Sequence, residues 1–148
     1  MKTFTIDNIR KFKPCYDPSK YLSEDWRGNI LDIFNIKECS FEDRLWLILR
    51  NDFVSEKLMR LFAVWCARQV QHLMKDERSL KVLDVAEAFA SGAATEQELT
   101  AARDAAWDAA RAAAMSAAMS AARDAARAAQ EEKLREMILA GIETGDVK

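Results

Sequence analysis

Few residues in this chain have a type and spacing that could carry out chemistry. His72 is the single histidine, so no second imidazole is present to share a metal ion with it. The three cysteines, Cys15, Cys39 and Cys66, lie far apart and never form the Cys-x-x-Cys spacing of a zinc or redox site. A partly exposed structural histidine and free thiols in a reducing compartment therefore explain these residues better than a metal site does.

The carboxylates do not form an acid–base pair either. Two adjacent residues on a helix point in different directions, and this applies to Glu42 with Asp43 and to Glu131 with Glu132. Asp104 and Asp108 do share a helix face, but Arg111 follows three residues later, which favours a surface charge network. The chain also has no Gly-rich phosphate loop, no GxSxG and no HExxH. We expect no enzyme, no cofactor and no metal.

Composition and charge limit the class of partner. The chain has 148 residues, of which 50% are hydrophobic and 31% are charged, enough for one domain with a buried core. Residues 1–78 hold 14 Lys+Arg against 12 Asp+Glu, and residues 79–148 hold 8 against 12. Neither half is basic enough to predict direct binding to nucleic acid through phosphate contacts.

The sequence predicts neither export nor membrane insertion. The first 13 residues, MKTFTIDNIRKFK, contain no apolar run of the kind that a secretory signal needs. No window approaches the apolar length of a membrane span. We therefore expect a cytoplasmic protein that has no membrane partner.

The sequence of residues 1–29, the first part of the chain, predicts an irregular arm. Ile6, Ile9 and Phe12 have the spacing of one side of a short helix, and Pro14 and Pro18 then interrupt regular structure. Residues 30–92 predict apolar helices at 3.6-residue spacing. The predicted N-caps or first residues of these helices are Ser40, Ser55 and Ser79, and the predicted ends are Asn51, about Lys75 and Gly92.

Residues 95–140 predict one long alanine-rich helix, and residues 141–148 a flexible tail. Thr95 and Glu98 form a capping box at its start. From Ala101 the pattern Ala-Ala-x-x repeats seven times, so the alanine stripe rotates by about 40° per repeat. Several neighbouring helices could pack against such a stripe in turn, which favours a spine wrapped by the earlier helices. The alternative is a solvated single helix that alanine alone holds together.

The tryptophans differ in their surroundings. Trp46 and Trp65 stand in strongly apolar stretches and are predicted to lie in the core. Trp107 interrupts the alanine repeat, so it either fixes a helix crossing or anchors a partner. The residues that we predict as candidate partner contacts are Arg103, Asp104, Trp107, Asp108, Arg111, Arg123, Asp124 and Arg127.

Several segments in this order resemble a known family. They are KPCYDPSKYL, EDRLWLILR, LMRLFAVWCARQV, DVAEAFASG and AARDAAWDAARAAA, and they cover roughly residues 10–140. The chain resembles small phage and bacterial immunity proteins that carry an Ala/Asp/Arg/Trp-rich helix. The resemblance implies a non-catalytic protein that binds and neutralises a toxin. Small phage genes of this kind also include inhibitors of host defence, CRISPR systems among them.

Together these features predict an all-α fold, a single-domain helical bundle with an irregular arm and an alanine-rich spine. Three classes of function stay open at this point. The first is an inhibitor that binds one protein target, either a toxin or a defence effector. The second is a structural homo-oligomer, with a homodimer formed through the C-terminal helix, and the third is an enzyme with an unrecognised site.

Overall fold

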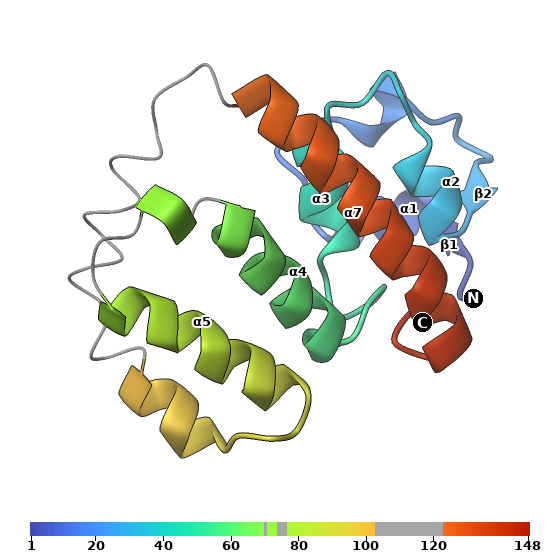
Figure 1. The fold of residues 1–148 in the computed structure, drawn as a ribbon. Coiled ribbons are helices and arrows are strands. Elements are labelled where there is room, and N and C mark those ends of the chain that lie inside the picture. Colours follow the sequence, from blue (N-terminus) through green and yellow to red (C-terminus); the bar gives the residue numbers. More distant parts are fainter. Residues whose placement is uncertain (70, 74–76, 103–122) are drawn as a thin grey trace. The chain divides into compact units, whose positions relative to one another are not determined.

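The computed structural model describes residues 1–69, 71–73, 77–102 and 123–148, and Figure 1 shows that this part of the chain is mainly helical. The all-α prediction is confirmed, with one addition, a two-stranded antiparallel sheet. The chain divides into two compact units. Unit 1 consists of Met1–Ser55 with Arg135–Lys148, and unit 2 consists of Glu56–Leu134. The single domain stays a prediction, because this division does not show whether either unit folds alone.

Unit 1 begins with the small sheet. Strand β1 (Phe4–Thr5) pairs with β2 (Arg27–Gly28), so that Phe4 lies opposite Gly28. Thr5 also caps α1 (Ile6–Lys11), in a box where Asn8 Oδ1 accepts from the Thr5 N–H at 2.9 Å. The arm predicted as irregular is thus more ordered than expected. Strands of two residues are too short to show the alternation that identifies a strand in a sequence.

The helical spacing predicted within the arm is confirmed for Ile6 and Ile9, whereas Phe12 is the C-cap of α1 and is half-buried. Ile6 and Ile9 are each 1% exposed and form the buried side of α1. After α1, Pro18 begins the short 3-10 helix η1 (Pro18–Lys20), where the Asp17 side chain accepts from the Ser19 N–H. Proline suits this position, because the first residue of a helix has no intrahelical acceptor for an N–H.

Two capped helices follow in unit 1. Asn29 caps α2 (Ile30–Phe34), and Ser40 caps α3 (Phe41–Ile48) by accepting from the Asp43 N–H at 3.1 Å. The predicted Ser40 cap is confirmed, although α3 ends three residues before the predicted Asn51. The prediction that Trp46 belongs to the core is wrong, because this side chain is 40% exposed. Arg44 and Ile48 define the buried face of α3, and a residue two positions from both lies about 200° round the helix.

A charged side chain lies in the core of unit 1. Arg44 is only 7% exposed, and its guanidinium lies over the rings of Phe34 and Phe41, with Cζ 5.6 and 5.8 Å from their centroids. Its Nε donates to the Cys39 carbonyl at 3.2 Å, and its Nη1 donates to the Phe34 carbonyl. Arg44 thereby connects the end of α2 to the loop before α3. This role was not predicted from the sequence.

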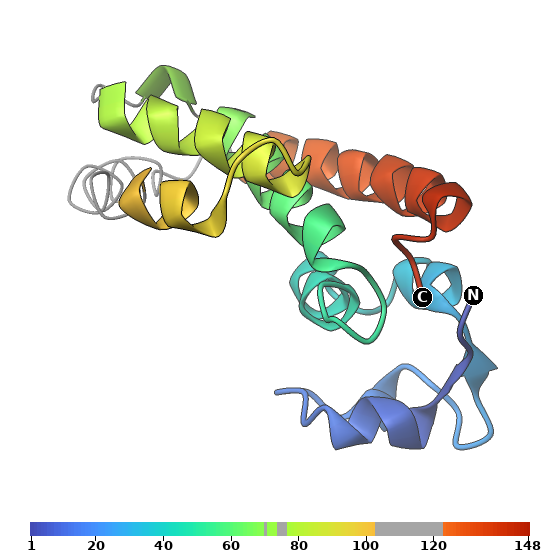
Figure 2. The same ribbon diagram turned by 90° about the horizontal axis from the view of Figure 1, so that it is seen from below.

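The predicted flexible tail is also wrong. Helix α7 (Arg123–Thr144) extends past Gly141, and the last residues pair with the chain that follows α3. Val147 is 8% exposed and forms a bridge with Val54, and the Lys148 N–H donates to the Phe53 carbonyl at 2.8 Å. Figure 2 shows the two ends of the chain next to one another, where the Lys2 N–H donates to the Lys148 carbonyl at 3.0 Å.

In unit 2, α4 (Glu56–Gln69) and α5 (Glu77–Ala90) lie side by side (Figure 1). Arg68 joins them through Nη2, which lies 2.9 Å from Asp84 Oδ1 and 2.6 Å from Glu87 Oε2. Trp65, predicted as core, is only half-buried, and its ring stacks on Phe62 at 6.5 Å. After α4 comes the 3-10 helix η2 (Gln71–Leu73).

The ends of α5 agree in part with prediction. The helix begins at Glu77, two residues before the predicted cap Ser79, so that cap is wrong. The predicted stop at Gly92 is confirmed, since Gly92 has φ +76°. Its N–H donates to the Phe89 carbonyl and the Ala93 N–H donates to the Ala88 carbonyl, which is the hydrogen-bond pattern of a Schellman motif.

The segment predicted as one alanine-rich helix, residues 95–140, is described only at its two ends. The capping box is confirmed, because the Thr95 N–H donates to Glu98 Oε2 at 2.7 Å and the Glu98 N–H donates to Thr95 Oγ1 at 3.2 Å. Residues 96–102 are helical, and α7 begins at Arg123. Most of the Ala-Ala-x-x repeat lies outside the described residues, so the spine, its continuity and the role of Trp107 stay predictions.

Candidate functional site: a cation–aromatic surface in unit 1

The residues predicted to contact a partner are mostly beyond the described part of the chain. Arg103, Asp104, Trp107, Asp108 and Arg111 all lie outside it. Arg123 and Asp124 begin α7, and Arg127 one turn later is exposed. The described residues therefore do not show whether these eight positions form one surface.

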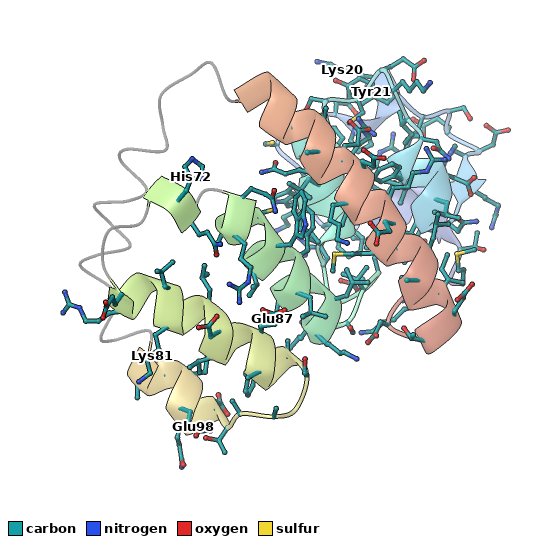
Figure 3. All side chains as sticks on the ribbon, in the orientation of Figure 1. Lys20, Tyr21, His72, Lys81, Glu87 and Glu98 are labelled. Atoms are coloured by element: carbon teal, nitrogen blue, oxygen red, sulfur yellow. The ribbon has the colours of Figure 1, made fainter. Side chains whose placement is uncertain are left out.

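His72 is exposed on η2 (Figure 3). Among the described residues, no group of three or more His, Cys, Asp or Glu side chains could hold a metal ion. No helix in the same residues is both long enough and apolar enough to cross a membrane.

A hollow of about 730 Å³ lies in unit 2 between α5 and residues 96–102. Its lining combines small apolar side chains with charged ones, among them Lys81 and Glu98, which Figure 3 labels. The lining reaches Ala102, which is the last described residue before residues 103–122. Its boundary is therefore not complete within the described residues, and we base no site on it.

A cation–aromatic surface in unit 1 is complete within the described residues. Arg50 Cζ lies 4.6 Å from the centroid of the Phe12 ring and 5.0 Å from that of the Trp46 ring. Both distances are within the range in which a guanidinium is attracted to a ring face. We call Phe12, Trp46 and Arg50 together the Trp46 face.

Local structure positions each member of the Trp46 face. Phe12 is the C-cap of α1, and Lys13 directly after it has φ +54°, so the chain turns away at this point. Trp46 lies on the exposed side of α3, and Arg50 follows it by four residues. The Arg50 carbonyl accepts from the N–H groups of Phe53 and Val54, at 2.9 and 3.1 Å, which fixes the backbone in a turn.

The hydrogen-bonding capacity of Arg50 is largely unused within the described residues. Its Nε is buried and has no hydrogen-bond partner there. Asp52 Oδ2 lies 4.0 Å from that nitrogen, close enough for charge attraction but too far for a hydrogen bond. The Arg50 side chain is 32% exposed, so part of the guanidinium stays open to solvent.

A smaller hollow of about 220 Å³ adjoins the Trp46 face, since Phe12 belongs to the lining of the hollow as well. Its lining residues are Lys2, Phe4, Asn8, Lys11, Phe12 and Asp52. The aromatic floor is continuous with the core, because the Phe53 ring lies 4.0 Å from the Phe4 ring and 5.9 Å from the Phe12 ring. We call this hollow the Lys2–Lys11 hollow.

The sequence does not reveal this surface, for a specific reason. The stretch around Trp46 is apolar on almost every side of the helix, and this pattern predicts a buried tryptophan. The Trp-x-x-x-Arg spacing of Trp46 and Arg50 was the available signal, because residues four apart can meet along a helix. Nothing in the sequence places Lys2, Lys11 or Phe12 beside them.

The three thiols differ in their surroundings. Cys15 is exposed, Cys39 is buried and Cys66 is half-buried, and all three are free. Burial, followed by the nearby charge of Asp43, raises the pKa of Cys39 to about 11, and burial likewise raises the pKa of Cys66. Burial also raises the pKa of Tyr16 well above its ordinary value. A raised pKa keeps each of these three groups protonated at neutral pH, so none of them is an activated nucleophile.

The thiol chemistry gives a direct test of this packing. At pH 8, Ellman's reagent should modify the exposed Cys15 rapidly and Cys39 much more slowly, because Cys39 is buried and its raised pKa leaves little of it as thiolate. The Cys15→Ser variant should lose the fast phase alone. The fold favours the protonated Cys39 thiol, because the pKa of Cys39 is about 11 in the folded protein and 9.0 without the fold. The stability that the protonated thiol contributes should therefore be present below about pH 9 and be lost as the pH rises through 11. Equally fast modification of Cys39 and Cys15 would contradict the described core.

Comparison with known proteins identifies no relative of this chain. No protein-family model, no curated protein and no solved structure matches this chain. The resemblance to immunity proteins therefore stays a prediction.

Proposed function

We propose that this protein is a non-catalytic inhibitor that binds one protein target directly through the Trp46 face. The observation that carries the proposal is the 40% exposure of Trp46, held in place by a guanidinium that is itself partly open to solvent. Trp and Arg are enriched among the residues that contribute most to protein–protein binding. Trp46 supplies a large apolar area with little conformational freedom, and Arg50 supplies directional donors beside it.

The resemblance to immunity proteins makes a toxin the first class of target to test. A defence effector is the second class, since both would be neutralised by direct contact. In both cases the interaction needs a rigid surface rather than a catalytic residue. The caps and the turn that hold the Trp46 face supply such rigidity.

Substituting Trp46 tests this proposal. Trp46→Ala should abolish capture of the target from a host lysate, because it removes the main apolar anchor, and a hot-spot residue of this type is worth at least about 2 kcal/mol of binding. The matched control is Leu80→Ala in unit 2, which removes another exposed apolar side chain, 37% exposed. Mass spectrometry of the captured proteins compares the two variants with the unmodified protein. Capture of the same protein by all three would show that the target does not use Trp46.

A homodimer is the second candidate, and one observation favours it. Leu139 on α7 is 48% exposed, more than any other large hydrophobic side chain described except Met1. Light scattering after size exclusion distinguishes the two candidates, because a dimer through α7 should dissociate in Leu139→Glu. A monomeric mass for the unmodified protein would eliminate the homodimer and leave the inhibitor.

A further inference from the structure

We infer that the Trp46 face and the Lys2–Lys11 hollow together bind an acidic segment of a protein target. An apolar side chain of that segment packs on Trp46, and a carboxylate enters the hollow between the two lysines. This inference rests on the proposed function and specifies the chemistry of its partner.

The first argument is continuity. Phe12 contributes one ring to both features, because Arg50 lies over it at 4.6 Å and it also lines the hollow. A single extended segment could therefore contact Trp46 and the hollow at the same time. Because the Phe12 ring belongs to both features, one ligand that spans them fits this arrangement better than two separate ligands do.

The second argument is charge. Lys2, Lys11 and Arg50 supply three positive charges around these features, and Asp52 is the one carboxylate among the described lining residues. Lys2 Nζ lies over the Phe4 ring, 5.3 Å from its centroid, and Lys11 is exposed. A surface with a local excess of positive charge favours a negatively charged partner, because charge complementarity speeds association and fixes how the two surfaces align.

The third argument is unused donor capacity. Within the described residues the Arg50 side chain donates no hydrogen bond, and the carboxylate beside it, that of Asp52, lies 4.0 Å from the buried Nε. A guanidinium binds a carboxylate through paired N–H donors, and clusters of such cations are a recurring mode of acidic-motif recognition. The aromatic contacts to Arg50 fix its plane without occupying these donors.

The size of the hollow and the overall charge of unit 1 narrow the class of ligand further. At about 220 Å³ the hollow is smaller than the roughly 300–1,000 Å³ of small-molecule sites, and it suits one side chain of a larger partner. Unit 1 as a whole holds 11 Lys+Arg against 12 Asp+Glu, so it lacks the broad positive field that binds nucleic acid. The local excess of charge therefore favours an acidic protein segment over a nucleic acid.

The test uses two synthetic peptides and the full chain labelled with nitrogen-15. The acidic probe is acetyl-Glu-Glu-Leu-Glu-Glu-amide, and the neutral probe replaces every Glu with Gln. The acidic peptide should shift the amide resonances of Lys11, Phe12 and Arg50 and bind about tenfold more tightly than the neutral one, a difference of about 1.4 kcal/mol. Raising the salt from 50 to 500 mM should remove most of that difference.

Paired lysine variants test the location of the site. Lys2→Gln with Lys11→Gln should weaken binding of the acidic peptide by about tenfold, because the carboxylate loses both cations. The matched control is Lys20→Gln with Lys37→Gln, which removes two exposed lysines of unit 1 that do not line the hollow. An equal loss in both pairs would overturn the inference, because it would show a response to net charge alone.

The remaining outcomes separate this inference from the proposed function. Equal binding of the two peptides, or binding of neither, would overturn the inference that the ligand is acidic. Loss of target capture in Trp46→Ala would in that case still support the proposed inhibitor function. Tighter binding of a ten-residue oligothymidylate than of the acidic peptide would overturn it in favour of nucleic acid. Target capture that is unaffected by Trp46→Ala would instead defeat the proposed function itself.

Discussion

Phe53→Ala is expected to lower the free energy of unfolding by about 3–5 kcal/mol, the range for removing a fully buried aromatic ring. Phe53 is 0% exposed, and its ring stacks on Phe4 at 4.0 Å and contacts Phe12 at 5.9 Å. Alanine would leave a cavity at the meeting point of β1, the end of α1 and the turn after α3. Urea denaturation followed by circular dichroism measures the change as a shift in the midpoint at constant slope.

Phe53→Leu is the control for the ring itself. It keeps most of the apolar volume and should cost clearly less than alanine, since the residual cavity sets part of the penalty. Phe12 should also become less well positioned in Phe53→Ala, so the resonances of the Trp46 face should shift without a substitution there. A loss below about 1 kcal/mol in Phe53→Ala would mean that Phe53 does not occupy the core as described.

Arg44→Met is expected to cost about 2–4 kcal/mol, because the charge-assisted hydrogen bonds to the Phe34 and Cys39 carbonyls are lost and these acceptors stay buried. Methionine keeps the length and much of the apolar contact of the arginine stem, so the variant isolates the polar part of the interaction. The same denaturation experiment measures the loss.

Arg10→Met is the matched control for Arg44→Met. Arg10 has a bidentate pair with Glu24 at 2.5 and 2.8 Å, but water reaches this pair, since the Arg10 side chain is 38% exposed and that of Glu24 69%. Its removal should therefore cost much less than that of Arg44, because exposed ion pairs contribute little. A buried cation can sometimes be replaced by an apolar group without loss. An unchanged midpoint for Arg44→Met would place this protein in that class.

The caps at Ser40 and Thr95 were predictable because they depend on residues close together in the chain, although the predicted cap at Ser79 is wrong. The Ser40 hydroxyl accepts a hydrogen bond from the N–H of the residue three positions later. In the same way, the side chains of Thr95 and Glu98 each accept a hydrogen bond from the backbone N–H of the other residue. The φ of +76° at Gly92 likewise follows from the chemistry of one residue. Such signals need no knowledge of the tertiary structure, and the structure confirms all three.

Burial was predicted less well, because it depends on which face of a helix meets the rest of the fold. Trp46 and Arg44 lie two residues apart on α3, and the structure buries the arginine while it exposes the tryptophan. Hydrophobicity alone predicts the reverse arrangement. Two backbone carbonyls and two rings around Arg44 make its burial favourable, and those groups come from residues 34, 39 and 41.

The candidate site was predictable only in part. The i, i+4 spacing of Trp46 and Arg50 is visible in the sequence. Phe12 lies 38 residues before Arg50, and only the tertiary structure brings its ring to the Arg50 guanidinium and brings Lys2 and Asp52 to one hollow. The residues predicted in the alanine repeat are largely outside the described chain and stay a separate hypothesis.

The composition of unit 1 from two distant segments has a consequence for synthesis on the ribosome. Val54 and Ser55 find their partners at Val147 and Asp146, after residues 56–134 have been made. Closing a loop of this length costs chain entropy before any contact compensates for it. Unit 2 is continuous in sequence, so its helices can begin to pair while the chain is still being extended. The pairing of Val54 and Ser55 in unit 1 can form only after Asp146 and Val147 have been synthesised, so this part of unit 1 is completed later than the helix pair of unit 2.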